Sequence, residues 1–355
     1  MQNIKEIALP EFKPSSKVET LDVDAFLGRE DSVILDIRSE GEYATGHIEN
    51  AISFPLFNNE ERAQVGTTYK RRGKSKAVEL GLEIVGPKLH QFVKDAKALG
   101  CTKNFHLYCW RGGMRSGSMA WLLSTAGLRV SLLKGGYKAY RQSFVDCVAK
   151  DWKFITILGS TGTGKTELLR ALESKGEQML DLEGLANHKG SVFGSFGLGA
   201  QPSTEEFINR IHQKLREFDS SKRVWVEGES MMIGSCYIPQ QLYDKLLVSP
   251  YYLTNMPRQE RIERLSEEYG SFDLELVEMA FTKITKRMGG NNVKDALDAF
   301  RGGDVARAVS IALDYYDKGY AMASEKRVGQ NLGEIVLQSH NHDEVAVTLI
   351  ENCIL

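Results

Sequence analysis

The chain has 355 residues, of which 42% are hydrophobic and 26% are charged, and its net charge is −2. This is the composition of a soluble globular protein, and the length allows two domains that each bury a core. No apolar run approaches the roughly 18 to 20 residues of a membrane span, and the first six residues lack the apolar core of a signal peptide. We therefore expect a cytoplasmic protein with no membrane segment.

The first predicted elements are two apolar segments joined by a polar stretch. Residues 32–36 read as a short buried strand, and residues 51–54 form a second apolar segment. The joining stretch, residues 36–51, has the sequence Asp-Ile-Arg-Ser-Glu-Gly-Glu-Tyr-Ala-Thr-Gly-His-Ile-Glu-Asn-Ala.

A dense group of cations follows, with five Lys or Arg residues in the seven positions 70–76 and a tyrosine beside them. A run of this kind is usually a solvated face of the protein. The alternative is a contact with a nucleic-acid backbone, for which it is the best candidate in the chain. The residues concerned are Tyr69, Lys70, Arg71, Arg72, Lys74 and Lys76.

Strands and helices then alternate. Apolar spacing predicts a helix over residues 80–99, a strand at 105–108, a helix over 116–125 and a strand at 130–133. This alternation predicts a parallel sheet with both faces covered by helices. Loops that carry function lie at the carboxyl ends of strands in such sheets, and Cys109 falls at one of these ends.

The five cysteines are odd in number, scattered and never spaced as CxxC, which argues against a disulfide framework and a structural zinc site. They are expected to be free thiols. Cys109 opens the loop Cys-Trp-Arg-Gly-Gly-Met-Arg-Ser. A nucleophilic cysteine must be a thiolate, and the loop amides, the start of the next helix and two arginines favour that form and can bind an oxyanion. The predicted catalytic residues are Cys109, Arg111 and Arg115.

A phosphate-binding loop opens the second predicted domain. Residues 153–158 read as a strand, Gly-Ser-Thr-Gly-Thr-Gly-Lys-Thr follows at 159–166, and a helix is predicted over 165–174. In such a P-loop, glycines let backbone amides face an anion, Lys165 neutralises phosphate oxygens, and the Thr166 hydroxyl can hold magnesium. The predicted phosphate-binding residues are Gly159, Thr161, Gly162, Gly164, Lys165 and Thr166.

The acid that accompanies nucleotide hydrolysis is less clearly marked. Residues 223–227 are predicted to form a strand that ends in an acidic residue. The candidates for the acid are Glu227 and Glu229, where glutamate replaces the usual aspartate. Nucleotide turnover therefore stays open. The glycine-rich residues 181–194 suggest either a mobile loop near the phosphate site or a plain surface loop. The later predicted elements are a strand at 251–254, a largely helical region at 258–326, a strand at 335–338 and a helix at 343–350.

Three segments of the first domain resemble the rhodanese family, namely residues 36–51, 109–116 and 133–137, which lie in the family's order. One departure concerns the loop, because Arg115 stands six positions after Cys109, where the common sulfurtransferase has its arginine at five. Six is also the spacing of phosphatases with a cysteine nucleophile. The wider loop suits a tetrahedral anion larger than a bare sulfane, and a phosphate ester is the alternative substrate.

The rhodanese resemblance also bears on the polar stretch. It implies that His47 has a structural role in its turn, and that Asp36 and Arg38 brace the loop and do not react. Taken together, the chain is predicted to be an α/β protein. Residues 1–148 form a rhodanese-like parallel-sheet domain, and residues 149–355 form a P-loop NTPase-like α/β domain with a helical C-terminal part. The boundary is expected near residues 145–152.

Over nearly its full length the chain resembles the tRNA 2-selenouridine synthase family, through Cys-Trp-Arg-Gly-Gly-Met-Arg-Ser, Leu-Glu-Gly-Leu-Ala-Asn-His-Lys-Gly-Ser and Val-Glu-Gly-Glu-Ser. The resemblance implies action on 2-thiouridine at the tRNA wobble position. Such enzymes attach a geranyl group from geranyl diphosphate to the sulfur and then replace S-geranyl with selenium from selenophosphate. An enzyme that makes selenophosphate is then a further expected partner.

The resemblance gives the motifs their expected roles. Cys109 would be the selenium carrier or nucleophile, with Arg111 and Arg115 binding the selenophosphate oxyanion. The P-loop would hold the diphosphate of the prenyl donor or the phosphate of another substrate. The cations of residues 70–76 would meet the anticodon region of tRNA.

Two other readings stay open at this point. The first is an ATP-dependent kinase or NTPase with a regulatory phosphatase-like or inert rhodanese module, which predicts nucleotide turnover without RNA and tolerance of Cys109→Ser. The second is a binding module that delivers sulfur to a partner. It predicts a persulfide on Cys109 and no change in RNA.

Overall fold

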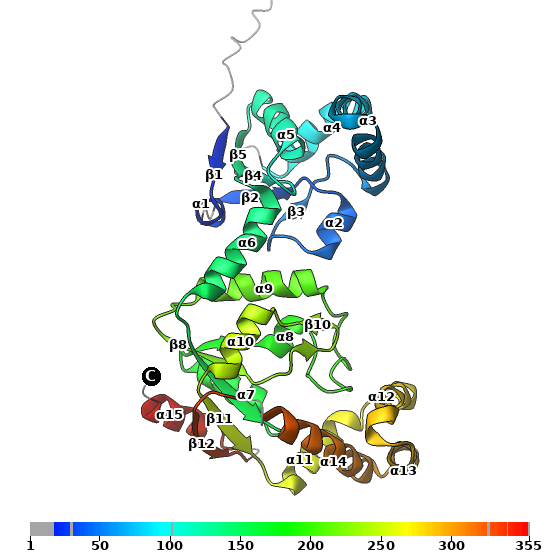
Figure 1. The fold of residues 1–355 in the computed structure, drawn as a ribbon, viewed down its shortest axis with the longest axis vertical. Coiled ribbons are helices and arrows are strands. Elements are labelled where there is room, and N and C mark those ends of the chain that lie inside the picture. Colours follow the sequence, from blue (N-terminus) through cyan, green and yellow to red (C-terminus); the bar gives the residue numbers. More distant parts are fainter. Residues whose placement is uncertain (1–17, 29–30, 101, 325–326, 339, 354–355) are drawn as a thin grey trace, which may run out of the picture. The chain divides into compact units, whose positions relative to one another are not determined.

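A computed structural model describes residues 18–353 except 29–30, 101, 325–326 and 339 (Figure 1). The N-terminal segment and Cys101, on which sequence expectations fell, lie outside the described residues. The chain divides into two compact units, residues 1–143 and 144–355, and the division falls inside helix α6 (Gly136–Ala149). Each unit is an α/β fold built on a parallel sheet, as the alternating pattern predicts.

The sheet of the first unit has the strand order β1-β5-β4-β2-β3, and all its pairs are parallel. Its strands are β1 (Glu19–Leu21), β2 (Ser32–Asp36), β3 (Ile52–Ser53), β4 (Asn104–Tyr108) and β5 (Arg129–Leu133). Its helices before α6 are α1 (Val23–Leu27), α2 (Glu40–Thr45), α3 (Asn59–Val85), α4 (Leu89–Ala98) and α5 (Met114–Thr125).

Side chains that alternate along the strands bury both faces of this sheet. Leu35, Phe105 and Leu107 point to one face and pack with residues of α3, α4 and α5. Tyr108 and Leu133 belong to a second cluster that includes residues of α1 and α6. The strands are therefore covered on both sides, and their carboxyl ends stay at the edge where Cys109 follows β4.

The predicted helix over residues 80–99 is wrong in extent. The structure has the long helix α3, a 3₁₀ turn at Gly86–Lys88 and the separate helix α4. Pro87 lies inside the turn, where its missing N–H and fixed ring do not suit a continuing α-helix. The first part of α3 has no apolar stripe to reveal it, because Ala77 and Val85 are its only buried residues. Its start is set by Asn58 and Glu61, which form a capping box.

The sheet of the second unit has the order β12-β11-β6-β8-β7, again parallel throughout. Its strands are β6 (Lys153–Gly159), β7 (Gln178–Leu180), β8 (Arg223–Glu227), β11 (Tyr251–Asn255) and β12 (Asn331–Val336), and β9 (Met232–Ile233) and β10 (Cys236–Tyr237) form a separate hairpin. The helices that accompany the sheet are α7 (Lys165–Ser174), α8 (Leu182–Ala186), α9 (Thr204–Glu217), α10 (Gln240–Val248) and α15 (His342–Asn352).

Successive residues of β6 again face opposite sides of the sheet. Phe154 packs with α9 and α10, whereas Ile155 and Ile157 pack with α7 and α15. The helical region predicted at 258–326 consists of α11 (Arg258–Tyr269), α12 (Leu274–Met288), α13 (Gly290–Arg301) and α14 (Val305–Ser324), with a core of its own. Across the described residues, every helix is too short or too polar to span a lipid bilayer.

Candidate functional site

The cysteine loop lies between β4 and α5, at the carboxyl end of a central strand. Cys109 is 3% exposed, and its Sγ accepts a hydrogen bond of 3.2 Å from Ser116 Oγ in the first turn of α5. The helix begins at Met114 after Gly113. The sulfur therefore lies near the positive end of a helix dipole, and a hydroxyl donor is within reach to stabilise a thiolate.

The backbone of residues 135–138 fixes the shape of this loop. Tyr137 N donates to Cys109 O at 2.9 Å, and Lys138 N donates to Trp110 O at 2.9 Å. Gly136 has φ = +62°, and a Cβ built there would stand 2.2 Å from Cys109 O. Only glycine fits this position, both for its backbone conformation and for its contact with the loop.

We expect Gly136→Ala to destabilise the protein by more than about 3 kcal/mol, because the strain of a positive φ adds to a clash that must displace the loop. Gly127→Ala is the matched control, since Gly127 has φ = +86° and open space around its Cβ position. It should cost only about 1 kcal/mol. Urea unfolding of the full chain measures the free energy of unfolding of both variants. Equal losses in the two variants would show that the loop shifts to relieve the clash at little cost.

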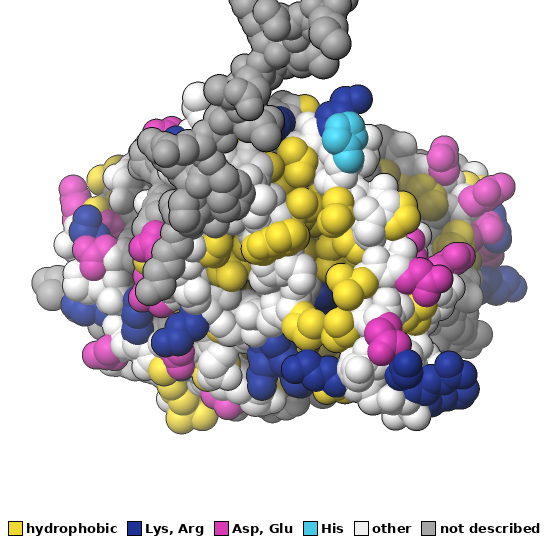
Figure 2. Space-filling view, turned by 90° about the horizontal axis from the view of Figure 1, so that it is seen from above, with side chains coloured by type: hydrophobic (Ala, Val, Ile, Leu, Met, Phe, Trp, Pro, Cys, Tyr) yellow, Lys and Arg dark blue, Asp and Glu magenta, His cyan; other side chains and the backbone are white. Residues whose placement is uncertain are grey.

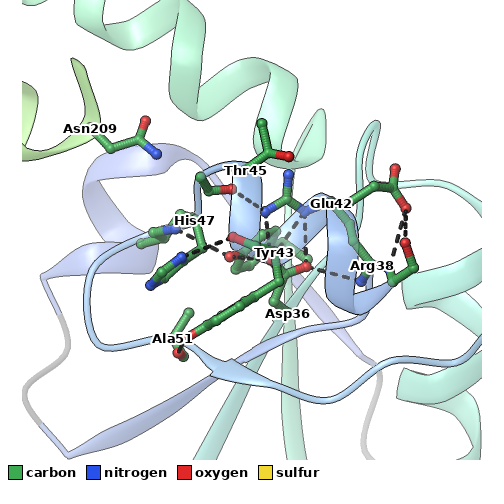
Figure 3. Close-up of polar contacts among 12 residues, drawn as sticks. Asp36, Arg38, Glu42, Tyr43, Thr45, His47, Ala51 and Asn209 are labelled. Atoms are coloured by element: carbon green, nitrogen blue, oxygen red, sulfur yellow. Dashed lines mark hydrogen bonds and ion pairs between the residues drawn. The ribbon is translucent and has the colours of Figure 1, made fainter. Parts of the chain in front are cut away.

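A buried ion pair supports the loop from the neighbouring strand (Figure 3). Arg38 is 1% exposed, and its Nη2 lies 2.6 Å from Asp36 Oδ2 and also donates to Gly46 O at 2.6 Å. Burial opposes the charge of Arg38, but Asp36 outweighs it and raises the arginine pKa. Its guanidinium stands 3.8 Å from the centre of the Tyr137 ring, and Tyr108 donates its hydroxyl to Asp36 Oδ2 at 2.8 Å. These contacts join β2, β4 and α6 beneath the loop.

His47 lies in the turn after α2. Its ring stacks on Tyr43 with centroids 3.8 Å apart, and its Nδ1 lies 3.1 Å from Tyr43 O (Figure 3). These contacts hold the turn together. The arrangement agrees with the structural role that the rhodanese resemblance implies.

The two arginines of the loop differ in their surroundings. Arg111 is exposed, and no acidic partner for it occurs among the described residues. Arg115 instead pairs with Glu42 of α2, with Nη1 and Oε2 2.7 Å apart. Burial alone would raise the pKa of Glu42, but the hydrogen bond and charge of Arg115 outweigh it and lower the pKa to about 2. The sequence does not reveal this partner, and Glu42 partly offsets the charge that Arg115 can offer to an anion.

The phosphate loop has the geometry that its motif predicts. It joins β6 to α7, and Gly162 and Gly164 have φ values of +81° and +83°. Lys165 Nζ donates to Gly159 O at 2.7 Å, which folds the lysine back over the loop. Thr166 Oγ1 points to Glu183 Oε2 at 3.5 Å. The loop lines a cavity of about 650 Å³, together with residues of α8, the 187–198 segment and α11 and α14.

Of the two acids predicted from the strand pattern, Glu229 lines this cavity and Glu227 does not. Glu227 at the end of β8 is fully buried and does not line the cavity, and its Oε2 accepts a hydrogen bond from Leu182 N at 2.9 Å. Burial, with Asp181 and Glu183 nearby, raises its pKa. Glu229 and Glu183 do line the cavity. The sequence pattern does not single out Glu183. Burial and the charge of Glu229 raise its pKa to about 8.

The glycine-rich residues 181–194 line the same cavity as the P-loop. The prediction that they form a loop is wrong for residues 182–186, which form helix α8. The rest of the segment contacts helices α11 and α14. Phe193 packs against Tyr269 with ring centroids 4.7 Å apart, and Val192 N donates to Tyr316 Oη at 3.0 Å. His188 is 8% exposed, and its Nδ1 has no hydrogen-bond partner among the described residues.

The basic run lies on the exposed surface of α3. Tyr69 is 59% exposed, and the five cations are exposed as well. Gly73, with φ = +86°, breaks the helix in the middle of the run. Arg62, two turns earlier in α3, lies 3.5 Å from Glu42, so this helix passes close to the partner of Arg115. Figure 2 shows a face on which Lys and Arg side chains border a hydrophobic area.

Comparisons with known proteins match both units. The family model of the tRNA 2-selenouridine synthase AAA domain matches residues 152–299, and that of the rhodanese-like domain matches residues 20–143. A tRNA 2-selenouridine synthase of Pseudomonas fluorescens (strain Pf0-1) is 33% identical over 344 residues, 86% of this chain and 92% of the relative. Another, from Aeromonas salmonicida (strain A449), is 36% identical over 256 residues, 68% of this chain and 65% of the relative.

One solved structure, the N-terminal domain of a protein from Clostridium difficile 630, is 44% identical and covers 35% of this chain and 98% of its own, with a TM-score of 0.34. The family matches and the two parallel sheets confirm the predicted fold. A rhodanese-like domain comes first, and a P-loop-like domain with a helical C-terminal part follows.

Proposed function

The chain belongs to the tRNA 2-selenouridine synthase family, and on that basis we propose that it converts wobble 2-thiouridine of tRNA to 2-selenouridine through an S-geranyl intermediate. The observation that carries the proposal is the pairing, in one chain, of a cysteine loop and a P-loop cavity. Each follows the carboxyl end of a strand of a parallel sheet, where such folds hold their ligands. The tRNA substrate makes the cytoplasm the expected location.

The first step is assigned to the P-loop cavity. Backbone amides at Gly162 and Gly164, with the Lys165 ammonium, would bind the diphosphate of geranyl diphosphate. The thiocarbonyl sulfur attacks the allylic carbon, the C–O bond breaks, and diphosphate leaves with the bonding electrons. The S-alkylated ring then loses its N3 proton to water. The Thr166 hydroxyl and the Glu183 side chain offer hard oxygen atoms that fit Mg²⁺, which would supply further positive charge for the diphosphate. Glu183, with its raised pKa, would give up its proton when it binds the ion.

The second step is assigned to the cysteine loop. Alkylation turns the sulfur into a leaving group. The selenium of selenophosphate then attacks the ring carbon, the C–S bond breaks and geranyl thiolate leaves, and water cleaves the P–Se bond to release phosphate. Cys109 is proposed as the selenium carrier or nucleophile, supported by its helix N-terminus and by the Ser116 hydroxyl. Arg111 and Arg115 are proposed to bind the oxyanion of selenophosphate. An enzyme that produces selenophosphate would be the supplying partner.

The exposed cations of α3 are proposed to contact the tRNA backbone near the anticodon. We expect the double variant Arg71→Ala, Arg72→Ala to weaken tRNA binding and to reduce the slope of log affinity against log salt by roughly 1.5 to 2, since two phosphate contacts are lost. Filter binding across a salt series measures this. The control replaces Lys94 and Lys97 of α4, which are exposed cations outside the run. Equal slopes in wild type and the α3 variant would contradict the assignment.

The experiment that tests the function is incubation of the protein with thiolated tRNA, geranyl diphosphate and selenophosphate, followed by mass spectrometry of the digested nucleosides. S-geranyl-2-thiouridine should form first and 2-selenouridine next. A parallel reaction with ATP and no RNA measures nucleotide turnover. Rapid ATP hydrolysis together with unmodified tRNA would favour a kinase or NTPase instead.

A further inference from the structure

The carboxylate of Glu42 stands at the meeting point of α2, α3 and the cysteine loop. Arg115 approaches it with two nitrogens, Nη1 at 2.7 Å and Nη2 at 3.4 Å from its oxygens. Ser39 N donates to Oε2 at 3.2 Å, and Arg62 Nε lies 3.5 Å from the same oxygen. Glu42 is thus the acidic partner of the arginine that the loop's spacing assigns to anion binding.

This contact changes the charge that an incoming anion meets. Asp36 and Arg38 form a buried ion pair, so their charges offset each other and Arg38 is not available to an incoming anion. Glu42, whose lowered pKa keeps it ionised at neutral pH, directly opposes the charge of Arg115 at 2.7 Å, while the more exposed Arg62 contacts the same carboxylate at 3.5 Å. Arg111 alone in the loop has no acidic partner among the described residues. A guanidinium binds carboxylate and phosphate oxygens through the same bidentate hydrogen bonds. A carboxylate and a phosphate therefore compete for the same N–H donors of Arg115.

We propose that Glu42 determines which anions the Cys109 loop accepts, by acting as the resident counter-ion of Arg115 with which an incoming oxyanion must compete. The inference rests on the oxyanion-binding role proposed above for the loop. A singly charged carboxylate gains nothing by replacing Glu42. A doubly charged phosphate-type group can outweigh it, because its attraction to the arginine and the loop amides is stronger. Glu42 is therefore a specificity-determining residue.

The test compares two alkylating reagents that differ in charge, iodoacetate and iodoacetamide, on the full-length protein. Peptide mass spectrometry measures the rate of modification at Cys109 with each reagent, with and without inorganic phosphate as a competitor. Glu42→Gln removes the charge, and glutamine still serves the capping box with Ser39. We expect the iodoacetate-to-iodoacetamide rate ratio to rise by about 3- to 10-fold, and phosphate to protect Cys109 at correspondingly lower concentration.

Two further variants separate charge from folding. Glu42→Asp keeps the carboxylate and should return the rate ratio to within about 2-fold of wild type. Arg62→Gln removes the other cation that contacts Glu42 and should not raise the ratio. A Glu42→Gln ratio equal to or below that of wild type would overturn the inference and leave Glu42 as a support for Arg115. Absence of phosphate protection in wild type and in every variant would overturn the oxyanion role of the loop together with the inference.

Discussion

Replacing Cys109 with alanine should abolish selenium incorporation, with a loss of at least about 10³-fold, while geranylation of the tRNA continues within about 2-fold of wild type. The Ser116 hydroxyl and the amino end of α5 converge on this sulfur, and alanine leaves them without an atom that can carry selenium. The measurement is the quantity of 2-selenouridine and S-geranyl-2-thiouridine in digested tRNA over time.

The matched control for this variant is Cys147→Ala, which removes another buried cysteine side chain, from α6. It should leave both products unchanged. Supplying tRNA that already carries the S-geranyl group isolates the second step, and Cys109→Ala should fail on it while Cys147→Ala converts it. Selenium incorporation by Cys109→Ala at the wild-type rate would remove the cysteine from the mechanism.

Local motifs made much of the fold predictable. The bounds of β8 and α7 agree with the sequence reading, because a short apolar run before a charged turn and a P-loop before a helix are determined by neighbouring residues. The fold class could also be read in advance, since strands that alternate with helices imply a parallel sheet. The first part of helix α3, before residue 80, could not be predicted because the burial of the helix is confined to Ala77 and Val85.

The site residues that sequence reasoning missed depend on contacts between distant segments. Glu42 meets Arg115 across 73 positions, and this contact arises only when α2 and the loop meet beside the sheet. Glu183 faces Thr166 because β7 lies at the end of the sheet order and α8 follows it toward the P-loop. Glu227 is the opposite case. Its position at the end of a strand beside β6 fits the motif, yet its side chain turns into the interior to meet the start of α8.

Replacing Lys165 with alanine should reduce geranylation by roughly 10²- to 10³-fold, since removal of one charged donor to a developing anion costs about 3 to 4 kcal/mol. The leaving diphosphate gains negative charge as the C–O bond breaks, and Lys165 stands at the loop that would hold it. Production of S-geranyl-2-thiouridine from thiolated tRNA measures the loss. Lys175→Ala is the control, because Lys175 lies beyond the end of α7, away from the cavity lining, and pairs with Asp343.

The same variant should be rescued when its missing product is supplied. With tRNA that is already S-geranylated, Lys165→Ala should make 2-selenouridine within about 2-fold of wild type, because no diphosphate leaves in that step and the Cys109 loop is intact. Cys109→Ala should give the reverse pattern on the same two substrates. If Lys165→Ala fails equally on both tRNAs, the P-loop also serves the selenium step, and the division of the two reactions between the two loops is wrong.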